Sequence, residues 1–316
     1  MMFGLFALMC LIWGSTWLAM KFGVASVPPV FFGGTRFVAA GAAMLLHGWV
    51  RGEIRRLARG EIGRLLVLQI VMVVLTYGPL FWAIQYVPSG LTAVLDLALM
   101  PVSLVGFGIL LGEEQWSGTR AAALGCGFVG LAVLFGPQIV VPTDRLGLLG
   151  AGAIVFSAVV YSLGSVIARP MAQTMGASYM AGLTMLPGGL ALTAGPLVFE
   201  PGAVAAARFQ WTGAAWGGWL FLVMLGSLVA FTGYLRLIAA WGPARAGSYA
   251  YVSPVIAVVL GVLVVGEHVG PRDMLGMAFL LIAAFCSLRA AMPPARALHS
   301  SPGAGPLAPV GSYRRC

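Results

Sequence analysis

The sequence predicts an all-α integral membrane protein with ten transmembrane helices, arranged as two inverted five-helix repeats. Three observations support this prediction: the composition, the number of long apolar runs, and a proline and glycine pattern that occurs twice. The 316 residues are 60% hydrophobic and 9% charged, whereas soluble globular proteins carry about 25% charged residues. Such a chain cannot cover a water-facing surface, so we expect most of its surface to face lipid.

Ten runs are long and apolar enough to be membrane spans, which need about 20 residues each. The first lacks the basic segment and cleavage site of a signal peptide, so we expect it to be retained. Arg36 interrupts the second run. The tail at 291–316 is rich in Pro, Gly, Ala and Ser and is expected to be a disordered cytoplasmic segment. The predicted spans are 2–20, 30–49, 65–86, 89–111, 120–136, 147–168, 177–199, 214–239, 245–265 and 272–289.

One pattern occurs in both halves of the chain. The stretch Tyr86–Glu114 has a Pro near its start, Pro101 in mid-run and a Gly-Glu pair near its end. The stretch Trp241–Glu267 repeats this order around Pro254. Proline is tolerated at a helix start but kinks a helix interior. We therefore predict one repeat at 1–136, a linker at 137–146 and a second repeat at 147–290.

The distribution of basic residues predicts the topology. Short basic loops stay in the cytoplasm, and the loop at 50–64 carries five arginines. With this loop inside, both termini are cytoplasmic, and thirteen basic residues lie inside against five outside. Five spans per half is an odd number, so the halves must be inverted relative to each other. Inverted repeats around a shared site at the membrane midplane are a transporter architecture.

Several motifs resemble those of a known family. The runs IWGSTWLAMKFG (Ile12–Gly23) and GGTRFVAAG (Gly33–Gly41), with Pro28-Pro29 between them and the Pro…Pro…Gly-Glu helices, resemble the EamA-like family of the drug/metabolite transporter superfamily. The resemblance implies ten helices, residence in the inner membrane, and export or uptake of small metabolites or drugs. Two departures from that pattern are the acid at Asp96 and the doubled Glu113-Glu114.

Asp96 is the acid that lies inside a long apolar run. A charged side chain near the bilayer centre costs a few kcal/mol, so such residues are functional candidates. Asp96 could be a proton site, a counter-charge for a cationic substrate, or the structural partner of Arg36, which lies at a matching depth. Arg36 could instead bind an anionic substrate group. Lys21 is a further candidate for coupling or gating, and its alternative is snorkelling to the interface.

Polar and aromatic side chains recur on several predicted helices, where they suit an amphipathic substrate. The alternative is that the aromatic residues mark membrane interfaces and that the serines serve close helix packing. The predicted substrate-binding residues are Trp13, Ser15, Trp17, Tyr77, Trp82, Asp96, Tyr161, Ser165, Tyr234 and Tyr249.

Together these features predict a secondary transporter, an exporter of a small metabolite or drug-like molecule, with a proton-coupling role for Asp96 as one hypothesis. The expected partners are this small molecule and the lipid bilayer, with no nucleic acid, cofactor or metal. The sequence has no Walker, H-E-x-x-H or G-x-S-x-G motif, so we do not expect ATP-driven transport by this chain alone. Clusters of catalytic residues are scarce, because Asp96 is the only acid in the interior of a long apolar run, and we therefore do not expect an enzyme. The alternative is an integral-membrane enzyme acting on a lipid or prenyl substrate, which would need a cluster of catalytic residues.

Overall fold

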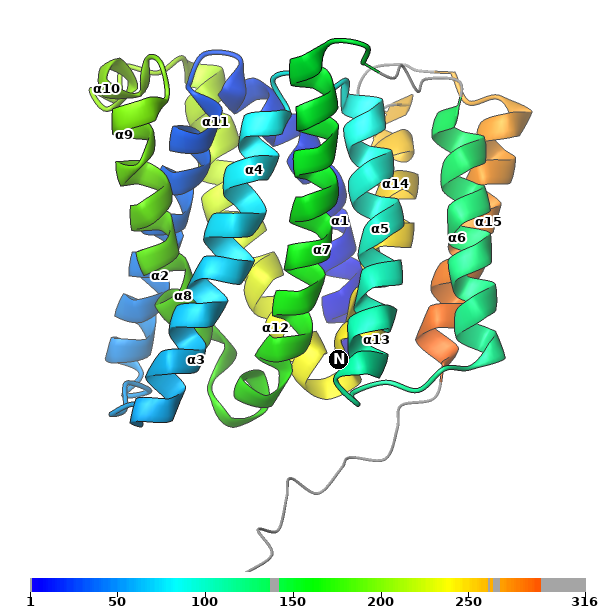
Figure 1. Ribbon diagram of the computed structural model, residues 1–316, viewed down its shortest axis with the longest axis horizontal. Coiled ribbons are helices and arrows are strands. Elements are labelled where there is room, and N and C mark those ends of the chain that lie inside the picture. The colour runs from blue at the N-terminus through cyan, green and yellow to red at the C-terminus, as the bar shows by residue number, and fades with distance from the viewer. Residues whose placement is uncertain (1, 137–141, 261, 264–267, 291–316) are drawn as a thin grey trace, which may run out of the picture.

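A computed structural model describes residues 2–136, 142–260, 262–263 and 268–290, and these residues form helices and connections without a strand. The main helices run side by side along one common direction (Figure 1). The α-helices, of which α9, α10 and α13 are single short turns, are α1 (Met2–Val24), α2 (Pro29–Val50), α3 (Arg59–Gln69), α4 (Leu75–Ala83), α5 (Ser89–Leu110), α6 (Gly118–Phe135), α7 (Arg145–Thr174), α8 (Ala177–Ala194), α9 (Pro196–Phe199), α10 (Ala203–Ala206), α11 (Gly213–Phe221), α12 (Thr232–Trp241), α13 (Pro243–Ala246), α14 (Tyr249–Leu260) and α15 (Pro271–Arg289).

Nine helical segments within the described residues are long and apolar enough to cross a membrane. These segments are α1, α2, α3 through α4, α5, α6, α7, α8 through α9, α11 through α12, and α15. The predicted span at 245–265 corresponds to α13 and α14, but part of it, and the Gly266-Glu267 pair, lie outside the described residues. The tenth span therefore stays a prediction.

Some helices extend beyond the predicted spans. α7 is 30 residues long and continues six residues past the predicted end at 168, with Pro170 inside it. The added turns contain Arg169, Gln173 and Thr174, which are too polar for a hydropathy pattern to include. Hydropathy detects the part of a helix that lies in lipid, whereas the helix itself continues into the aqueous region.

Among the described residues, π-helical segments interrupt two of the long spans, and the sequence analysis did not predict them. The segment η1 (Ile70–Val74) joins α3 to α4, and η3 (Leu222–Phe231) joins α11 to α12. After η1, the Thr76 hydroxyl donates to the carbonyl of Val71 at 2.8 Å. A π-helical turn changes the helical register, and such turns are frequent at functional sites. Both segments lie beside residues that line the central cavity described below.

Glycines allow α2 and α8 to pack closely. A Cβ atom added at Gly34 or Gly41 would collide with the α8 backbone at Leu192 or Leu186, and one added at Gly189 would lie 2.6 Å from the backbone nitrogen of Val38. Small residues allow the backbones of membrane helices to approach each other. The two backbones are therefore in direct contact at several levels of the bundle.

We expect Gly41→Val to separate α2 from α8 and to lower the free energy of unfolding by about 1–3 kcal/mol, because its side chain has no room. The midpoint of thermal unfolding in detergent measures this effect. The matched control is Gly125→Val on α6, where nothing lies within 4 Å of an added Cβ. Equal shifts for the two variants would contradict this account of the contact.

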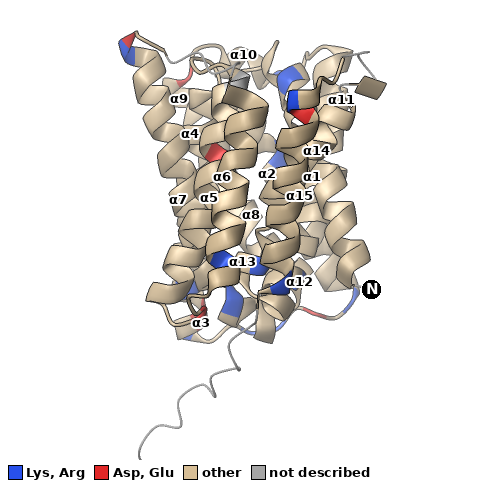
Figure 2. Cartoon of the chain, turned by 90° about the vertical axis from the view of Figure 1, so that its right-hand side faces the viewer, with Lys and Arg blue, Asp and Glu red and all other residues tan. Residues whose placement is uncertain are grey.

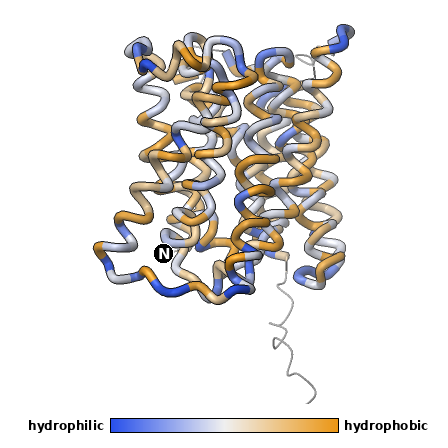
Figure 3. Tube along the Cα trace, turned by 60° about the vertical axis from the view of Figure 1, so that its left-hand side comes forward, coloured by the Kyte–Doolittle hydropathy of each residue, from blue (hydrophilic) through white to orange (hydrophobic). Residues whose placement is uncertain are grey.

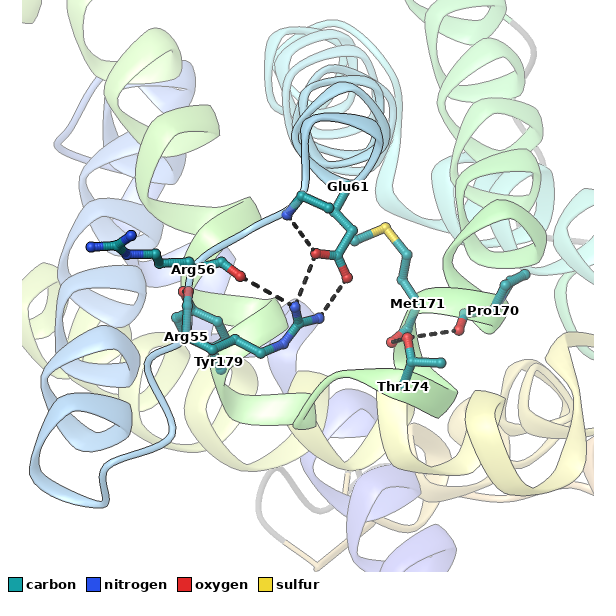
Figure 4. Close-up of polar contacts among 8 residues, drawn as sticks. Arg55, Arg56, Glu61, Pro170, Met171, Thr174 and Tyr179 are labelled. Carbon is teal, nitrogen blue, oxygen red and sulfur yellow. Dashed lines mark hydrogen bonds and ion pairs between the residues drawn. The ribbon is translucent and has the colours of Figure 1, made fainter. Parts of the chain in front are cut away.

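The start of α1 and the end of α15 lie at the same end of the bundle, which we call the termini end (Figure 1). Many of the Lys and Arg residues gather there, as Figure 2 shows. In the connection between α2 and α3, Arg55 donates to both carboxylate oxygens of Glu61, and the hydroxyl of Tyr179 donates to the Arg55 carbonyl at 3.3 Å (Figure 4). These bonds tie the basic loop to the start of α8.

The outer surface of the bundle is apolar along much of its length. Large hydrophobic side chains such as Leu110, Phe128 and Phe285 are exposed on it, and Figure 3 shows hydrophobic residues along the helices with hydrophilic ones mostly towards the two ends. An apolar surface of this extent marks a membrane interface. The protein is therefore a multi-pass membrane protein.

Candidate functional site

A cavity of about 90 Å³ lies inside the bundle. Its lining comes from α1, α2, α4, α5, α7, α8, η3 and α14, so helices from both ends of the sequence contribute. Most of the lining residues lie mid-helix or in the half remote from the termini end, whereas Tyr249 is the first residue of α14. They are Trp13, Thr16, Trp17, Met20, Arg36, Phe37, Thr76, Tyr77, Leu80, Asp96, Leu97, Met100, Ser157, Tyr161, Met185, Gly226, Ser227, Phe231, Tyr249 and Ser253.

Two charged residues line this cavity. Arg36 on α2 is 6% exposed, and its guanidinium carbon lies 4.4 Å from the ring centre of Phe37 and 5.2 Å from that of Tyr77. Asp96 on α5 is half-buried. In the described residues no ion pair within 4.0 Å joins them. The predicted Arg36–Asp96 pair is thus not formed in this conformation, although both side chains face the same space.

Aromatic side chains form one wall of the cavity. The Trp13 ring meets the Tyr249 ring edge-on with centroids 4.5 Å apart, and its indole N–H donates to the carbonyl of Gly226 at 3.2 Å. Tyr161 stacks on Tyr234 at 5.7 Å and meets Tyr77 edge-on at 6.5 Å. Edge-on and offset arrangements are the favourable ones for aromatic pairs, so the wall is a packed network that joins α1, α4, α7 and α14 and rests on Tyr234 of α12 behind it.

Of the residues predicted from the sequence, the structure brings seven to the cavity lining. These are Trp13, Trp17, Arg36, Tyr77, Asp96, Tyr161 and Tyr249. Tyr234 and Ser165 lie behind the wall: both are fully buried, and the Tyr234 hydroxyl donates to the Ser165 hydroxyl at 3.0 Å. They support the wall from the termini side without lining it.

Three predicted residues lie elsewhere. The Ser15 hydroxyl donates to the carbonyl of Leu11 at 2.7 Å within its own helix. Trp82 packs against Tyr86 at a centroid distance of 5.1 Å, and Lys21 is exposed. Helical spacing placed these residues near the right depth, but it did not determine which side of each helix faces the cavity.

Several lining residues were not among the predicted site residues. Phe37, Met100, Met185 and Phe231 are apolar and resemble ordinary core residues in the sequence. Thr76 and Ser227 adjoin or lie within the π-helical segments, whose shifted register a 3.6-residue period does not reproduce. The sequence could have identified Ser157, because it lies one helical turn before Tyr161. In the structure its hydroxyl donates to the carbonyl of Thr76 at 2.8 Å.

A second polar cluster closes the termini end. Glu114 pairs with Arg120, and the two side chains are 2% and 7% exposed. Glu113 pairs with Arg169 near the end of α7, with side chains 29% and 12% exposed. Each residue of the doubled Glu113-Glu114 therefore has its own arginine partner. We call these four residues the ionic cluster.

Gly242 fits against the ionic cluster. Its φ is 84°, and a Cβ added there would lie 3.0 Å from a carboxylate oxygen of Glu114. Positive φ favours glycine. The turn between α12 and α13 therefore requires glycine both for its backbone conformation and for the lack of room beside Glu114. The ionic cluster thereby joins the connection after α5 to the ends of α7 and α12.

The chain matches known proteins over most of its length. The EamA-like transporter family model matches residues 1–136 and 148–289. A relative named "Uncharacterized inner membrane transporter YedA" from Escherichia coli is 30% identical over 294 residues, which cover 89% of each chain. "Uncharacterized transporter YoaV" from Bacillus subtilis is 24% identical over 275 residues, covering 87% of this chain and 92% of the relative.

Two further comparisons agree with these. "Protein PagO" from Salmonella typhimurium is 26% identical over 287 residues, covering 90% of this chain and 91% of the relative. A solved crystal structure at 22% identity superposes with a TM-score of 0.75 and covers 90% of this chain and 94% of that one. The structural match concerns the fold alone.

Proposed function

This chain belongs to the EamA-like transporter family, and from that premise we propose that it is a secondary transporter that exports a small metabolite or drug-like molecule across the cytoplasmic membrane by alternating access. The observation that carries the proposal is the cavity, which is lined by both halves of the sequence and holds Arg36 and Asp96. A site shared by the two halves can be exposed to either side when they move relative to each other. The alternative of a membrane enzyme is set aside, because the relatives are named as transporters.

The packing of the helices supports two inverted repeats, 1–136 and 147–290. α2 packs against α8, and α6 packs against α15, so each of these four helices contacts its counterpart five spans away. α7 packs against α4 and α5, and α1 packs against their counterparts α11 and α14. Each contact between two helices thus has an equivalent contact between their counterparts in the other half of the sequence. A two-fold relation between the halves requires this equivalence.

The position of the cavity indicates the side of the membrane from which it is closed in this conformation. The cavity lies towards the half remote from the termini, whereas the ionic cluster and the buried Tyr234 lie on its termini side. The excess of basic residues at the termini end favours a cytoplasmic location for both termini. The described conformation then has its barrier on the cytoplasmic side.

Transport by the purified protein in liposomes tests the proposal. Liposomes loaded with a mixture of bacterial metabolites should lose at least one compound about tenfold faster than protein-free liposomes. Ser227→Trp, which fills the cavity, should abolish this loss. Gly217→Trp should retain it, because Gly217 is exposed on α11 with nothing within 4 Å of an added Cβ. The proposal fails if no compound leaves faster than from protein-free liposomes, or if the filled variant transports equally.

A further inference from the structure

The guanidinium group of Arg36 has no counter-charge within 4.0 Å in the described part of the chain. Its side chain is buried, and its Nε has no hydrogen-bond partner. Arginine stays protonated in proteins, so a full positive charge is held inside the bundle.

The aromatic residues around Arg36 compensate this charge only in part. Its guanidinium carbon lies 4.4, 5.2 and 5.4 Å from the ring centres of Phe37, Tyr77 and Phe81. Ring faces attract a cation by about 0.5–2 kcal/mol, but they do not accept the in-plane N–H bonds of a guanidinium group. Removing a charge from water costs several kcal/mol unless it is paired and hydrogen-bonded. The Nε–H of Arg36, which has no hydrogen-bond partner among the described residues, therefore offers a preformed donor for an acceptor in the cavity.

We propose that Arg36 is an anion-binding subsite of the cavity and that the transported molecule is a small organic carboxylate. The inference rests on the proposed function, because it names the substrate class of the same cavity. A carboxylate matches the planar fork of a guanidinium group and can accept two parallel hydrogen bonds from it. The rest of the lining includes Trp17, Phe231 and Met185, which suit an apolar body attached to the carboxylate.

Equilibrium binding tests this inference without any transport. The probes are butyrate, butyramide and butylammonium, which share an aliphatic chain and differ in charge. Saturation-transfer NMR titrations on the full chain in lipid nanodiscs would give the three dissociation constants. We expect butyrate to bind at least tenfold more tightly than butyramide, and butylammonium to bind no more tightly than butyramide.

Two substitutions and one control locate the subsite. Arg36→Gln should weaken butyrate binding at least tenfold and leave butyramide binding unchanged. Arg36→Lys, which keeps the charge but loses the fork, should weaken butyrate binding to an intermediate degree. The control is Arg208→Gln, which removes an exposed arginine towards the remote end and should leave all three constants unchanged. If Arg36→Gln does not fold, the comparison of the three probes on the wild type still tests whether the cavity prefers an anion.

Equal binding of butyrate and butyramide, or preferential binding of butylammonium, would overturn the anion subsite. An effect of Arg208→Gln equal to that of Arg36→Gln would also overturn it, since the effect would then be one of general surface charge. This failure is distinguishable from failure of the proposed function. A chain that exports a neutral or cationic compound from liposomes would remain a transporter without this subsite.

Discussion

Cargo binding is expected to release a proton from Asp96 in the wild type, and replacing Asp96 with Asn is expected to abolish this release. Asp96 lines the cavity from within α5, where an ionised carboxylate costs a few kcal/mol. Taking up a proton removes that cost, and a bound cargo or an altered helix arrangement can favour its release. Asn has nearly the same shape as Asp but does not gain or lose a proton. The transport cycle of this variant would therefore either run without moving a proton or stop.

The measurement is the release of protons when cargo is added to the protein in liposomes at weak buffering. The wild type should release protons with an accepted cargo, and Asp96→Asn should release none, a loss of at least tenfold. Other ionisable groups that line the cavity are Arg36, Tyr77, Tyr161 and Tyr249, and they are unchanged in this variant. Thr92→Val is the matched control, because Thr92 is buried one turn away and its hydroxyl donates to the carbonyl of Pro88.

Two outcomes would contradict proton coupling through Asp96. One is cargo binding by the wild type with no release of protons. The other is equal proton release by wild type and Asp96→Asn, which would assign the proton to another group. In either case two hypotheses for Asp96 remain: a counter-charge for a cationic substrate, and a partner for Arg36 in a conformation other than the one described.

Replacing Glu114 with Gln should destabilise the protein by about 3–5 kcal/mol, the usual cost of removing one partner of a buried ion pair. The substitution removes the Glu114 carboxylate from the buried Arg120, which keeps its hydrogen bond to the Gln115 carbonyl. Arginine cannot escape the cost of the lost counter-charge by losing its proton. The midpoint of thermal unfolding in detergent measures the effect. Glu113→Gln is the matched control in the adjacent position, where the carboxylate is 29% exposed and the expected cost is about 1 kcal/mol or less.

Replacing the arginine of the pair, Arg120→Met, should destabilise the protein less than Glu114→Gln does. Burial raises the pKa of the Glu114 carboxyl, while the Arg120 and Arg169 guanidinium groups lower it. Without Arg120, Glu114 can therefore stay protonated. A folded-state pKa above the unfolded value means that the folded state binds more protons, so the stability of this variant should fall as the pH rises above the ordinary carboxyl range. Equal destabilisation by Glu114→Gln and Glu113→Gln, or a pH-independent Arg120→Met, would contradict this account.

The sequence predicted the helices well and the cavity in part, for identifiable physical reasons. Hydropathy located the spans because the lipid-facing sides of helices such as α6 and α15 must be apolar. The charged residues Arg36 and Asp96 stood out because a charge within an apolar run is costly. Both line the cavity.

The remaining features depend on contacts between distant parts of the chain. Trp13 and Gly226 are 213 residues apart and share a hydrogen bond, which no local pattern encodes. The π-helical turns η1 and η3 change which side of the helix faces inward at Thr76 and Ser227. The doubled Glu113-Glu114 stood out as a departure from the family pattern, but its two arginine partners became visible only in the folded chain.

The close contact between α2 and α8 has a mechanical consequence. Glu200, which follows α9, accepts hydrogen bonds from the backbone N–H groups of Val30 and Phe31 at 2.9 and 2.8 Å, so the start of α2 is also clamped to the segment after α8. Any displacement that preserves these contacts carries the two helices together, although they come from different sequence halves. The stiff units of this protein are thus assembled across the two halves of its sequence, and a cysteine cross-link between α2 and α8 should leave transport intact.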